Sequence, residues 1–491
     1  MSEREGLGRT AARGAAVTVA AQIARMALQL ISVVTLARLL TPSDFGIVAI
    51  GLLVVGFGEL FRDFGLSQAA VQAPELSTDT RTNLFWINAA FGVGLAVLCY
   101  LAAWPVAAVT DAPEVIGVCH ALALTFVFNA LAAQYRAGLM RQLRFTALSL
   151  LEVVAAAAGL TVAIAGAVAG IGYWALVAQQ LTTIIVTLIA LVAMGRWLPG
   201  LPNRRGDVRS FLSFGWNLVA SQVVAYIASN VDTAIVGTRY STATLGLYNR
   251  AFQLVVVPVG QIRAPLTNVA LPVLSRLRDS DVEFNRFVVR AQLVMGYALC
   301  LALGFVAVAA DPIVRVLLGP DWGDSTFFLR CFSAAAMFQT LAFVGFWVYL
   351  SRALTHVLFR YSMVSAAIKI SCVVIGAFWG PTGIAIGFAV APALSWPISL
   401  WWLSRHAPIR LGMLYAGAGR ILGMTAVGIA VAVPVVLWTS FPPLAELALL
   451  AVAYAAGLLI LLSIPRYRKD AADIIATMKL VRSGRGGATP A

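Results

Sequence analysis

Charged residues are scarce in this chain of 491 residues. Asp, Glu, Lys and Arg make up 11% of it, against about 25% in an ordinary soluble domain, while hydrophobic residues make up 60%. A soluble fold of this length could not bury that much apolar surface. The composition therefore predicts a polytopic membrane protein and excludes a disulfide scaffold, a disordered tail protein and a soluble enzyme.

Residues that build metal and catalytic sites are also few. The three histidines are scattered, and the five cysteines lie in apolar stretches without the spacing of metal ligands. The chain contains no G-x-x-x-x-G-K-[ST] phosphate loop and no serine within G-x-S-x-G. We therefore expect no metal site, no cofactor and no enzymatic activity.

Apolar stretches of about 20 residues, the length that crosses a membrane, follow one another along the chain. We predict an all-α protein of about fourteen membrane helices. They cover 15–40, 44–66, 84–109, 115–138, 145–167, 171–194, 211–237, 245–274, 287–310, 326–350, 355–379, 382–404, 416–440 and 445–465. No loop between them exceeds about 20 residues, so no extramembrane domain is expected.

Basic residues fall almost entirely on one side of the predicted spans. If the N-terminus lies inside, 25 of the 35 Lys and Arg residues lie in the two tails and the alternate loops, and the outer loops hold only Arg239 and Arg315. Cytoplasmic loops are enriched in these residues. We therefore predict cytoplasmic termini. The net charge of +14 then follows from topology, without nucleic acid as a partner.

The two halves of the chain contain a repeat. The segment from Ala37, ARLLTPSDFGIVAIG, matches GTRYSTATLGLYNRA from Gly237 at an offset of 200, so that Gly46 falls on Gly246. The repeat predicts two parallel six-helix lobes that enclose a cavity at their interface. The predicted parts are an N-tail 1–14, a lobe 15–194, a basic linker 195–210, a lobe 211–404, two further helices 416–465 and a basic tail 466–491.

Several charged residues lie deep within predicted spans. On the insertion scale such a residue costs about 2.5–3.5 kcal/mol at a helix centre, so it should face a cavity or a partner. The candidate cavity cations are Arg25, Arg62, Arg250, Arg263 and Lys369. The polar residues expected beside them are Gln22, Gln29 and Gln253. Cations at several depths suit an anionic substrate such as a diphosphate.

Three acidic residues are candidates for ion coupling, and each has a second interpretation. Glu59 lies three residues before Arg62, so the two could simply neutralise each other. Asp63 lies near the end of its predicted helix, so it could simply be a solvated residue at the membrane surface. Glu152 is either the mate of a cavity arginine or a proton carrier.

The predicted helix 245–274 contains Pro258, Gly260 and Pro265. Proline removes a backbone hydrogen bond and bends a helix. The pattern predicts a kinked helix that moves as a gate, although a kink fixed by packing also fits.

The tail after the last span reads RYRKDAADIIATMKLV. Helical spacing puts Ala471, Ile474, Ile475 and Met478 on one face, and the basic residues favour anionic lipid. The pattern predicts a helix on the inner membrane surface, with membrane lipids as partners. A frayed tail fits equally well.

The stretch LARLLTPSDFGIVAIGLLVVGFGELFRDFGLSQAAVQ from Leu36, with NVDTAIVGTRYSTATLGLYNRAFQL from Asn230, resembles oligosaccharide flippases. These form part of the polysaccharide transporter branch of the multidrug/oligosaccharidyl-lipid/polysaccharide superfamily. The resemblance implies a protein of the bacterial inner membrane that moves undecaprenyl-diphosphate-linked oligosaccharide to the outer leaflet by alternating access. It further implies a polysaccharide polymerase and export machinery as partners.

The same resemblance bears on individual residues. Related lipid II flippases use cavity arginines on helices 1, 2 and 8, and Arg25, Arg62 and Arg263 or Arg250 lie on the comparable predicted helices. Those flippases also hold the lipid tail in an apolar groove formed by helices 13 and 14.

Two other functions compete with transport of a lipid-linked sugar. A cation-coupled multidrug antiporter of the same superfamily would need a mainly acidic cavity, whereas deep basic residues outnumber acidic ones here. A membrane polysaccharide polymerase or ligase would need a sizeable outer loop. The longest outer loop expected here, around 311–325, is short and acidic.

Overall fold

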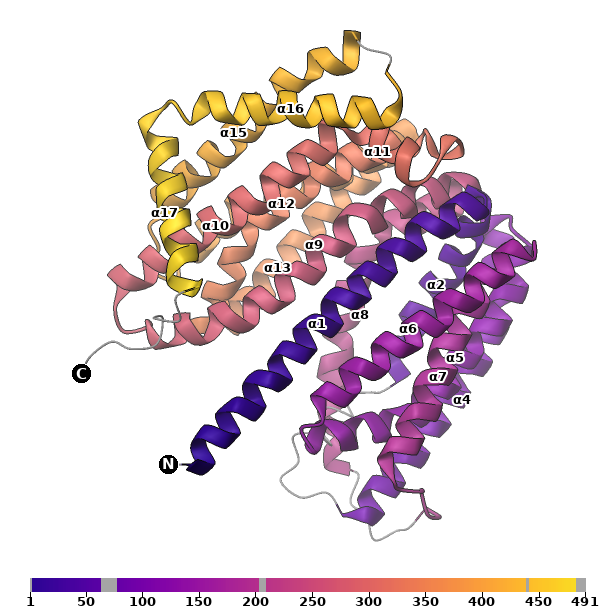
Figure 1. The fold of residues 1–491 in the computed structure, drawn as a ribbon. Coiled ribbons are helices and arrows are strands. Elements are labelled where there is room, and N and C mark those ends of the chain that lie inside the picture. The colour runs from indigo at the N-terminus through magenta and orange to yellow at the C-terminus, as the bar shows by residue number, and fades with distance from the viewer. Residues whose placement is uncertain (1, 63–76, 203–208, 439–440, 483–491) are drawn as a thin grey trace. The chain divides into compact units, whose positions relative to one another are not determined.

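The computed structural model describes residues 2–62, 77–202, 209–438 and 441–482, and every regular element within these ranges is a helix (Figure 1). The helices are α1 Ser2–Leu39, α2 Pro42–Arg62, α4 Thr78–Thr110, α5 Glu114–Arg141, α6 Phe145–Val168, α7 Trp174–Gly195, α8 Arg209–Arg239, α9 Thr242–Arg276, α10 Asp281–Val308, α11 Ala310–Leu317, η1 Pro320–Trp322, α12 Ser325–Ser351, α13 Thr355–Gly376, η2 Ala377–Trp379, α14 Gly380–Ser404, α15 Leu411–Trp438, α16 Pro443–Leu461 and α17 Pro465–Arg482. The predicted all-α class is confirmed.

Each of the predicted membrane helices corresponds to one helix of the structure. Within the described residues, twelve helical stretches are long and apolar enough to cross a membrane. One of these, Thr355–Ser404, contains both α13 and α14, and α8 is not among them. The first helix begins at Ser2, well before the predicted start at 15, and its apolar part begins at Val17.

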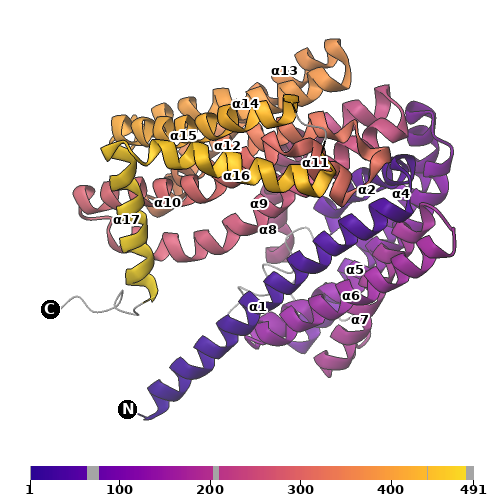
Figure 2. The ribbon, with the colours of Figure 1, turned by 45° about the horizontal axis from the view of Figure 1, so that its top comes forward.

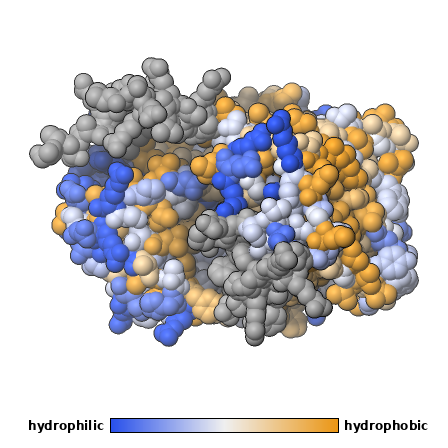
Figure 3. All heavy atoms as spheres, turned by 90° about the horizontal axis from the view of Figure 1, so that it is seen from below, coloured by the Kyte–Doolittle hydropathy of each residue, from blue (hydrophilic) through white to orange (hydrophobic). Residues whose placement is uncertain are grey.

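The outer faces of the helices are apolar. On α4, Val93, Leu98 and Leu101 are more than half exposed, as are Val452 and Leu459 on α16. Water would not favour such surfaces, whereas lipid tails would. Figure 3 views the molecule from below, and strongly hydrophilic residues gather there in patches bordered by hydrophobic surface. This is the expected pattern where helix ends meet water at a membrane surface.

The described helices fall into two compact units, Met1–Arg250 and Ala251–Ala491. In the first unit α4 packs on α5, α1 on α6, α6 on α7, and α2 on both α5 and α8. In the second unit α12 packs on α10 and α14, α13 on α14, and α15 on α10 and α16. The predicted six-helix boundaries remain a prediction, because α8 and the start of α9 group with the first unit.

Gly46 and Gly246, which the repeat aligns, each lie against the helix that contains the other, and these contacts fall within the first unit. A Cβ on Gly46 would overlap the carbonyl group of Thr242, and a Cβ on Gly246 would overlap that of Pro42. The Ser43 and Thr242 hydroxyls also lie 2.7 Å apart. Positions 42 and 242 are themselves related by the offset of 200, so the two copies of the turn contact each other reciprocally. Only glycine allows this close backbone approach.

The segment around 311–325, expected as a short acidic outer loop, contains short helices. It forms α11 and η1, and Trp322 is 1% exposed. Asp311 pairs with Arg315 one turn later at 2.8 Å. The connection between α10 and α12 is therefore ordered, with its large indole ring buried.

The basic tail is helical through α17, as one of its two interpretations predicted. Figures 1 and 2 both show the chain turning sharply after α16 before it enters α17 (yellow). Asp470 of α17 is buried, accepts a hydrogen bond from the Tyr297 hydroxyl at 2.9 Å and pairs with Arg420. α17 is therefore attached to α10 and α15 by buried polar contacts.

We expect Gly46→Ala to destabilise the protein, because the added methyl group must displace the Thr242 backbone. Overpacking of this kind costs about 1–3 kcal/mol. Thermal unfolding of the purified protein in detergent, followed by tryptophan fluorescence, measures the effect. Gly94→Ala is the matched control, since a Cβ there meets nothing within 4 Å. Equal melting temperatures for the two variants would contradict the close approach.

Candidate functional site

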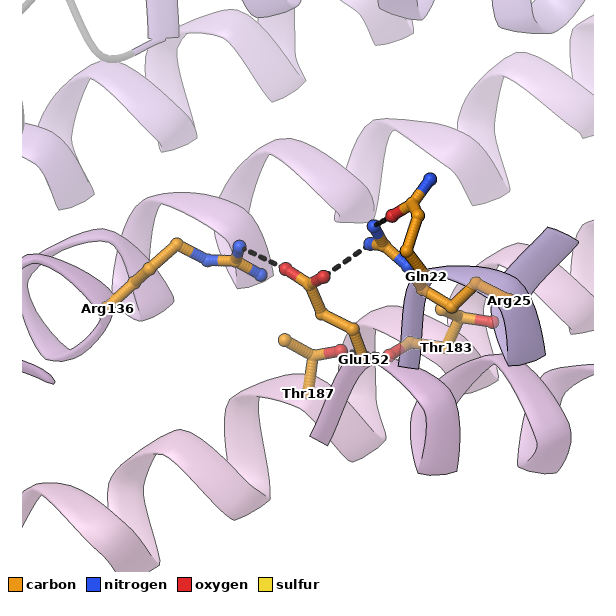
Figure 4. A network of polar contacts seen from close by, with 6 residues as sticks. All are labelled: Gln22, Arg25, Arg136, Glu152, Thr183 and Thr187. Atoms are coloured by element: carbon orange, nitrogen blue, oxygen red, sulfur yellow. Dashed lines mark hydrogen bonds and ion pairs between the residues drawn. The ribbon is translucent and has the colours of Figure 1, made fainter. Parts of the chain in front are cut away.

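A carboxylate shared by two arginines lies in the first unit. Glu152 of α6 pairs through Oε2 with the Arg25 guanidinium of α1. Its other oxygen, Oε1, lies 2.8 Å from Arg136 Nη1 of α5. Gln22 accepts a hydrogen bond from the same Arg25 guanidinium. Figure 4 shows Glu152 between the two arginines. We call Arg25, Glu152 and Arg136 the arginine triad.

The arginine triad carries more positive than negative charge and is accessible. Two guanidinium groups and one carboxylate leave one unit of positive charge. The side chain of Arg25 is 39% exposed and that of Arg136 is 42% exposed. An anion that reaches this surface can therefore contact both arginines.

The polar stripe predicted on the first helix is present on α1. Gln22, Arg25, Gln29 and Ser32 follow one another at spacings of three or four residues, so they share one helix face. Ser32 accepts a hydrogen bond from Gln179 of α7 at 3.1 Å. The stripe therefore meets polar groups of α6 and α7.

A second polar cluster joins α2 to α5. Arg62 pairs with Glu59, as the i, i+3 interpretation predicted, and donates to the backbone carbonyl of Asn129 at 3.3 Å. Glu59 in turn accepts from the Asn129 side-chain amide at 2.9 Å. This cluster is neutral overall. The candidate Asp63 lies outside the described residues.

Asn129 and Arg136, the partners on α5, were not among the candidate residues. They are seven residues apart, or two helical turns, so they share one face of α5 about 10 Å apart along its axis. The signal was an asparagine within an apolar run, followed two turns later by an arginine. Arg136 lies near the end of the predicted helix 115–138, whereas α5 extends to Arg141.

In the second unit, Arg263 of α9 contacts α12 through neutral groups. Its Nη2 donates to Thr340 Oγ1 at 3.1 Å and to the Ala336 carbonyl at 3.3 Å, and its Nη1 lies 3.4 Å from Gln339 Oε1. These partners orient the guanidinium without cancelling its charge.

Lys369 of α13 lies against an aromatic cluster of the second unit. Its Nζ is 4.7 Å from the Phe388 ring centroid, a distance at which the ring face attracts a cation. Phe252 and Phe332 complete the cluster, with ring centroids 5.0–6.0 Å apart. Gln253 follows Phe252 on α9 and is partly buried.

Arg250 is the most buried of the candidate cations. It is 4% exposed, and its guanidinium carbon lies 3.5 Å from the Phe45 ring centroid of α2. The cation is therefore covered in this structure, in contrast to Arg25.

The predicted gate helix is a single uninterrupted helix, α9, with Pro258 and Pro265 inside it. A Cβ on Gly260 meets nothing within 4 Å, and the residue is exposed. Its role as a gate remains a prediction.

The side chains of the described residues contain no group of three or more His, Cys, Asp or Glu positioned to hold a metal ion. The chemistry available at the arginine triad is therefore that of guanidinium groups and a carboxylate: binding of anions and exchange of ion-pair partners.

Comparison with known proteins identifies polysaccharide biosynthesis proteins as relatives. The lipopolysaccharide biosynthesis protein WzxC of Escherichia coli is 23% identical over 389 residues, covering 78% of each chain. The succinoglycan biosynthesis transport protein ExoT of Rhizobium meliloti is 23% identical over 315 residues, covering 64% of each chain.

Two solved structures share the fold. The lipid II flippase MurJ, in an inward closed conformation, superposes with a TM-score of 0.71 at 14% identity, covering 92% of this chain and 98% of MurJ. A multidrug resistance transporter of the MATE family, in the MOP superfamily, gives a TM-score of 0.57 at 14% identity, covering 80% of this chain and 99% of the transporter.

The decisive comparison is with a family model. Residues 35–327, more than half of the chain, match the model of the family described as polysaccharide biosynthesis protein. The resemblance seen in the stretch from Leu36 is thereby confirmed: this multi-pass membrane protein belongs to the polysaccharide biosynthesis protein family.

Proposed function

We propose that this protein is a flippase for undecaprenyl-diphosphate-linked oligosaccharide repeat units. It would move them from the inner to the outer leaflet of the bacterial cytoplasmic membrane for exopolysaccharide or lipopolysaccharide biosynthesis. The family match and relatives named for lipopolysaccharide and succinoglycan biosynthesis support this proposal. The fold shared with a lipid II flippase supports it as well. The protein is then a transporter rather than an enzyme.

The accessible arginine triad is the observation that carries the proposal. A guanidinium group binds phosphate through two parallel N–H···O bonds, and it keeps its charge at any physiological pH. The excess positive charge of the arginine triad favours an anion such as a diphosphate. In the second unit, Arg263 is a further candidate cation, because its contacts with Gln339 and Thr340 are with neutral groups.

The arginine triad suggests how the diphosphate is bound and released. We infer that a phosphate oxygen replaces Glu152 at the Arg25 guanidinium. Glu152 would keep its second partner, because its other oxygen pairs with Arg136. No carboxylate is then left unpaired in an apolar environment, which would be costly. Return of Glu152 to Arg25 would favour release.

Alternating access would complete the cycle. In this proposal α9 rearranges about Pro258, Gly260 and Pro265, and both termini lie in the cytoplasm. Glu59, Asp63 and Glu152 remain candidates for ion coupling, and a polymerase and export machinery remain candidate partners.

A strain that lacks this protein should accumulate its substrate. We expect mass spectrometry of lipid extracts to detect an undecaprenyl-diphosphate oligosaccharide that reagents added outside the cell cannot modify. Its mass would identify the repeat unit. Restoring the gene should return the lipid to its normal level.

The same strain tests the antiporter alternative, whose fold this chain also shares. Unchanged lipid-linked sugars together with increased sensitivity to cationic drugs would contradict the flippase proposal and favour drug export.

Replacement of Arg25 tests the role of the arginine triad. We expect Arg25→Ala to abolish polymer export, because the diphosphate loses its guanidinium partner, while Arg25→Lys retains part of it. Polymer at the cell surface and protein level in the membrane are measured together. Arg360→Ala, an exposed arginine of α13, is the control that should export normally. Normal polymer from Arg25→Ala would disprove its role.

Glu152 and Arg136 should show coupled effects on stability. We expect Glu152→Gln to lower the melting temperature, because two arginines lose their shared counter-charge. Adding Arg136→Gln should recover part of the loss, since it removes one unbalanced cation. The pair Asp311 and Arg315, on one helix and with the Arg315 side chain 55% exposed, provides a comparison cycle, in which Asp311→Asn and Arg315→Gln should have small, nearly additive effects. Additive effects at Glu152 and Arg136 would contradict the shared ion pair.

A further inference from the structure

A cationic cavity of about 490 Å³ lies in the second unit where α10, α15 and α17 meet. Six of its lining residues are basic, and only two, Asp470 and Asp473, are acidic. The basic residues are Arg286, Arg290, Arg410, Arg420, Arg466 and Lys469. The charges around the cavity therefore favour an anion strongly.

One of these cations is fixed by the fold, and the others are exposed. Arg420 donates to both carboxylate oxygens of Asp470, at 2.6 and 3.1 Å. This pair holds α17 against α15 and neutralises one positive charge. Arg286, Arg290 and Lys469 are exposed at the rim. The excess of four positive charges therefore lies where a ligand can reach it.

Apart from Asn285, the rest of the cavity wall is apolar. Val289 and Leu293 of α10, Met413 of α15 and Ile474 of α17 line it. A ligand that fits both parts must carry a negative group and an apolar portion. A free phosphate ion would leave this apolar wall in contact with water.

The predicted topology places the cavity at the level of the inner membrane surface. It forms at the first turns of α10 and α15 and along the first half of α17. These segments adjoin the basic loops and the tail that the charge distribution predicts to lie inside. Basic pockets between membrane helices on the cytoplasmic side are suited to anionic headgroups.

We propose that this cavity binds an anionic phospholipid of the inner leaflet. The phosphate headgroup would lie among the basic residues of α10, α15 and α17, and the acyl chains would lie along the apolar wall. The bound lipid attaches α17 to the two membrane helices. The site lies outside the arginine triad and does not depend on the transported substrate.

Native mass spectrometry of the purified full-length protein tests the proposal. The protein in detergent is titrated with phosphatidylglycerol and with phosphatidylcholine of the same acyl chains, and the dissociation constant of the first bound lipid is measured. We expect phosphatidylglycerol to bind more tightly. Arg290→Gln combined with Lys469→Gln should weaken it roughly 25-fold, at about five-fold for each removed charge.

The matched control combines Arg278→Gln with Arg468→Gln. These exposed arginines lie in the loop before α10 and on α17, outside the cavity lining. The control removes the same net charge, so its phosphatidylglycerol affinity should stay close to that of the unaltered protein. Lys469→Gln alone, at an exposed position, should weaken binding about five-fold, and it provides the test if the double variant does not fold.

Two results would overturn the proposal. Equal affinities for the two lipids, or equal losses in the cavity and control variants, would mean that the cavity does not select the anionic headgroup. Inorganic phosphate serves as competitor in a third arm, and we expect it not to displace the lipid at equal concentration. Complete displacement would assign the cavity to a soluble phosphate compound instead.

Discussion

A charge within an apolar helix needs a partner, and other helices supply most of the partners here. The cost of about 2.5–3.5 kcal/mol for an unaccompanied charge makes each such pairing a condition of the fold. Three helices thereby become linked at Glu152, and α17 is held to α15 at Asp470. Even Arg62, which pairs with Glu59 on its own helix, also contacts Asn129 of α5. The polar contacts thus accompany the packing of these particular helices.

These polar clusters differ in the net charge that remains once their ion pairs have formed. Glu59 cancels Arg62, whereas Glu152 is shared by two cations and cancels only one of them. Arg263 is oriented by neutral partners and keeps its full charge. Net charge and exposure therefore distinguish structural ion pairs from candidate binding groups. In the sequence, both kinds appear only as single charged residues within apolar stretches.

The helices and the repeat could be predicted because apolar length and sequence similarity are read from the chain directly, without knowledge of how the helices pack. The length of an apolar run defines a membrane helix, and the offset of 200 brought Gly46 onto Gly246 before their reciprocal contact was seen. The pairing of Glu59 with Arg62 was predictable for the same reason, since three residues on a helix fix their distance.

Partners on different helices could not be predicted, because they depend on how the helices pack. Arg136 is indistinguishable in sequence from a loop cation until α5 and α6 bring it to Glu152. Arg420 and Asp470 lie 50 residues apart, and neither carries a local sign of the other. The burial of Trp322 between α11 and α12 likewise depends on tertiary packing.

Because α17 is attached to α15, part of the C-terminal tail is required for the membrane helices to reach their final fold. Arg420 lies within α15, but its counter-charge, Asp470, belongs to a segment beyond the last membrane helix. A chain shortened before Asp470 would keep every membrane helix and still leave Arg420 without its counter-charge and the Tyr297 hydroxyl, midway along α10, without its acceptor. The folded bundle is therefore complete only once the residues that follow it have been synthesised, so α15 acquires its final environment after translation of the tail.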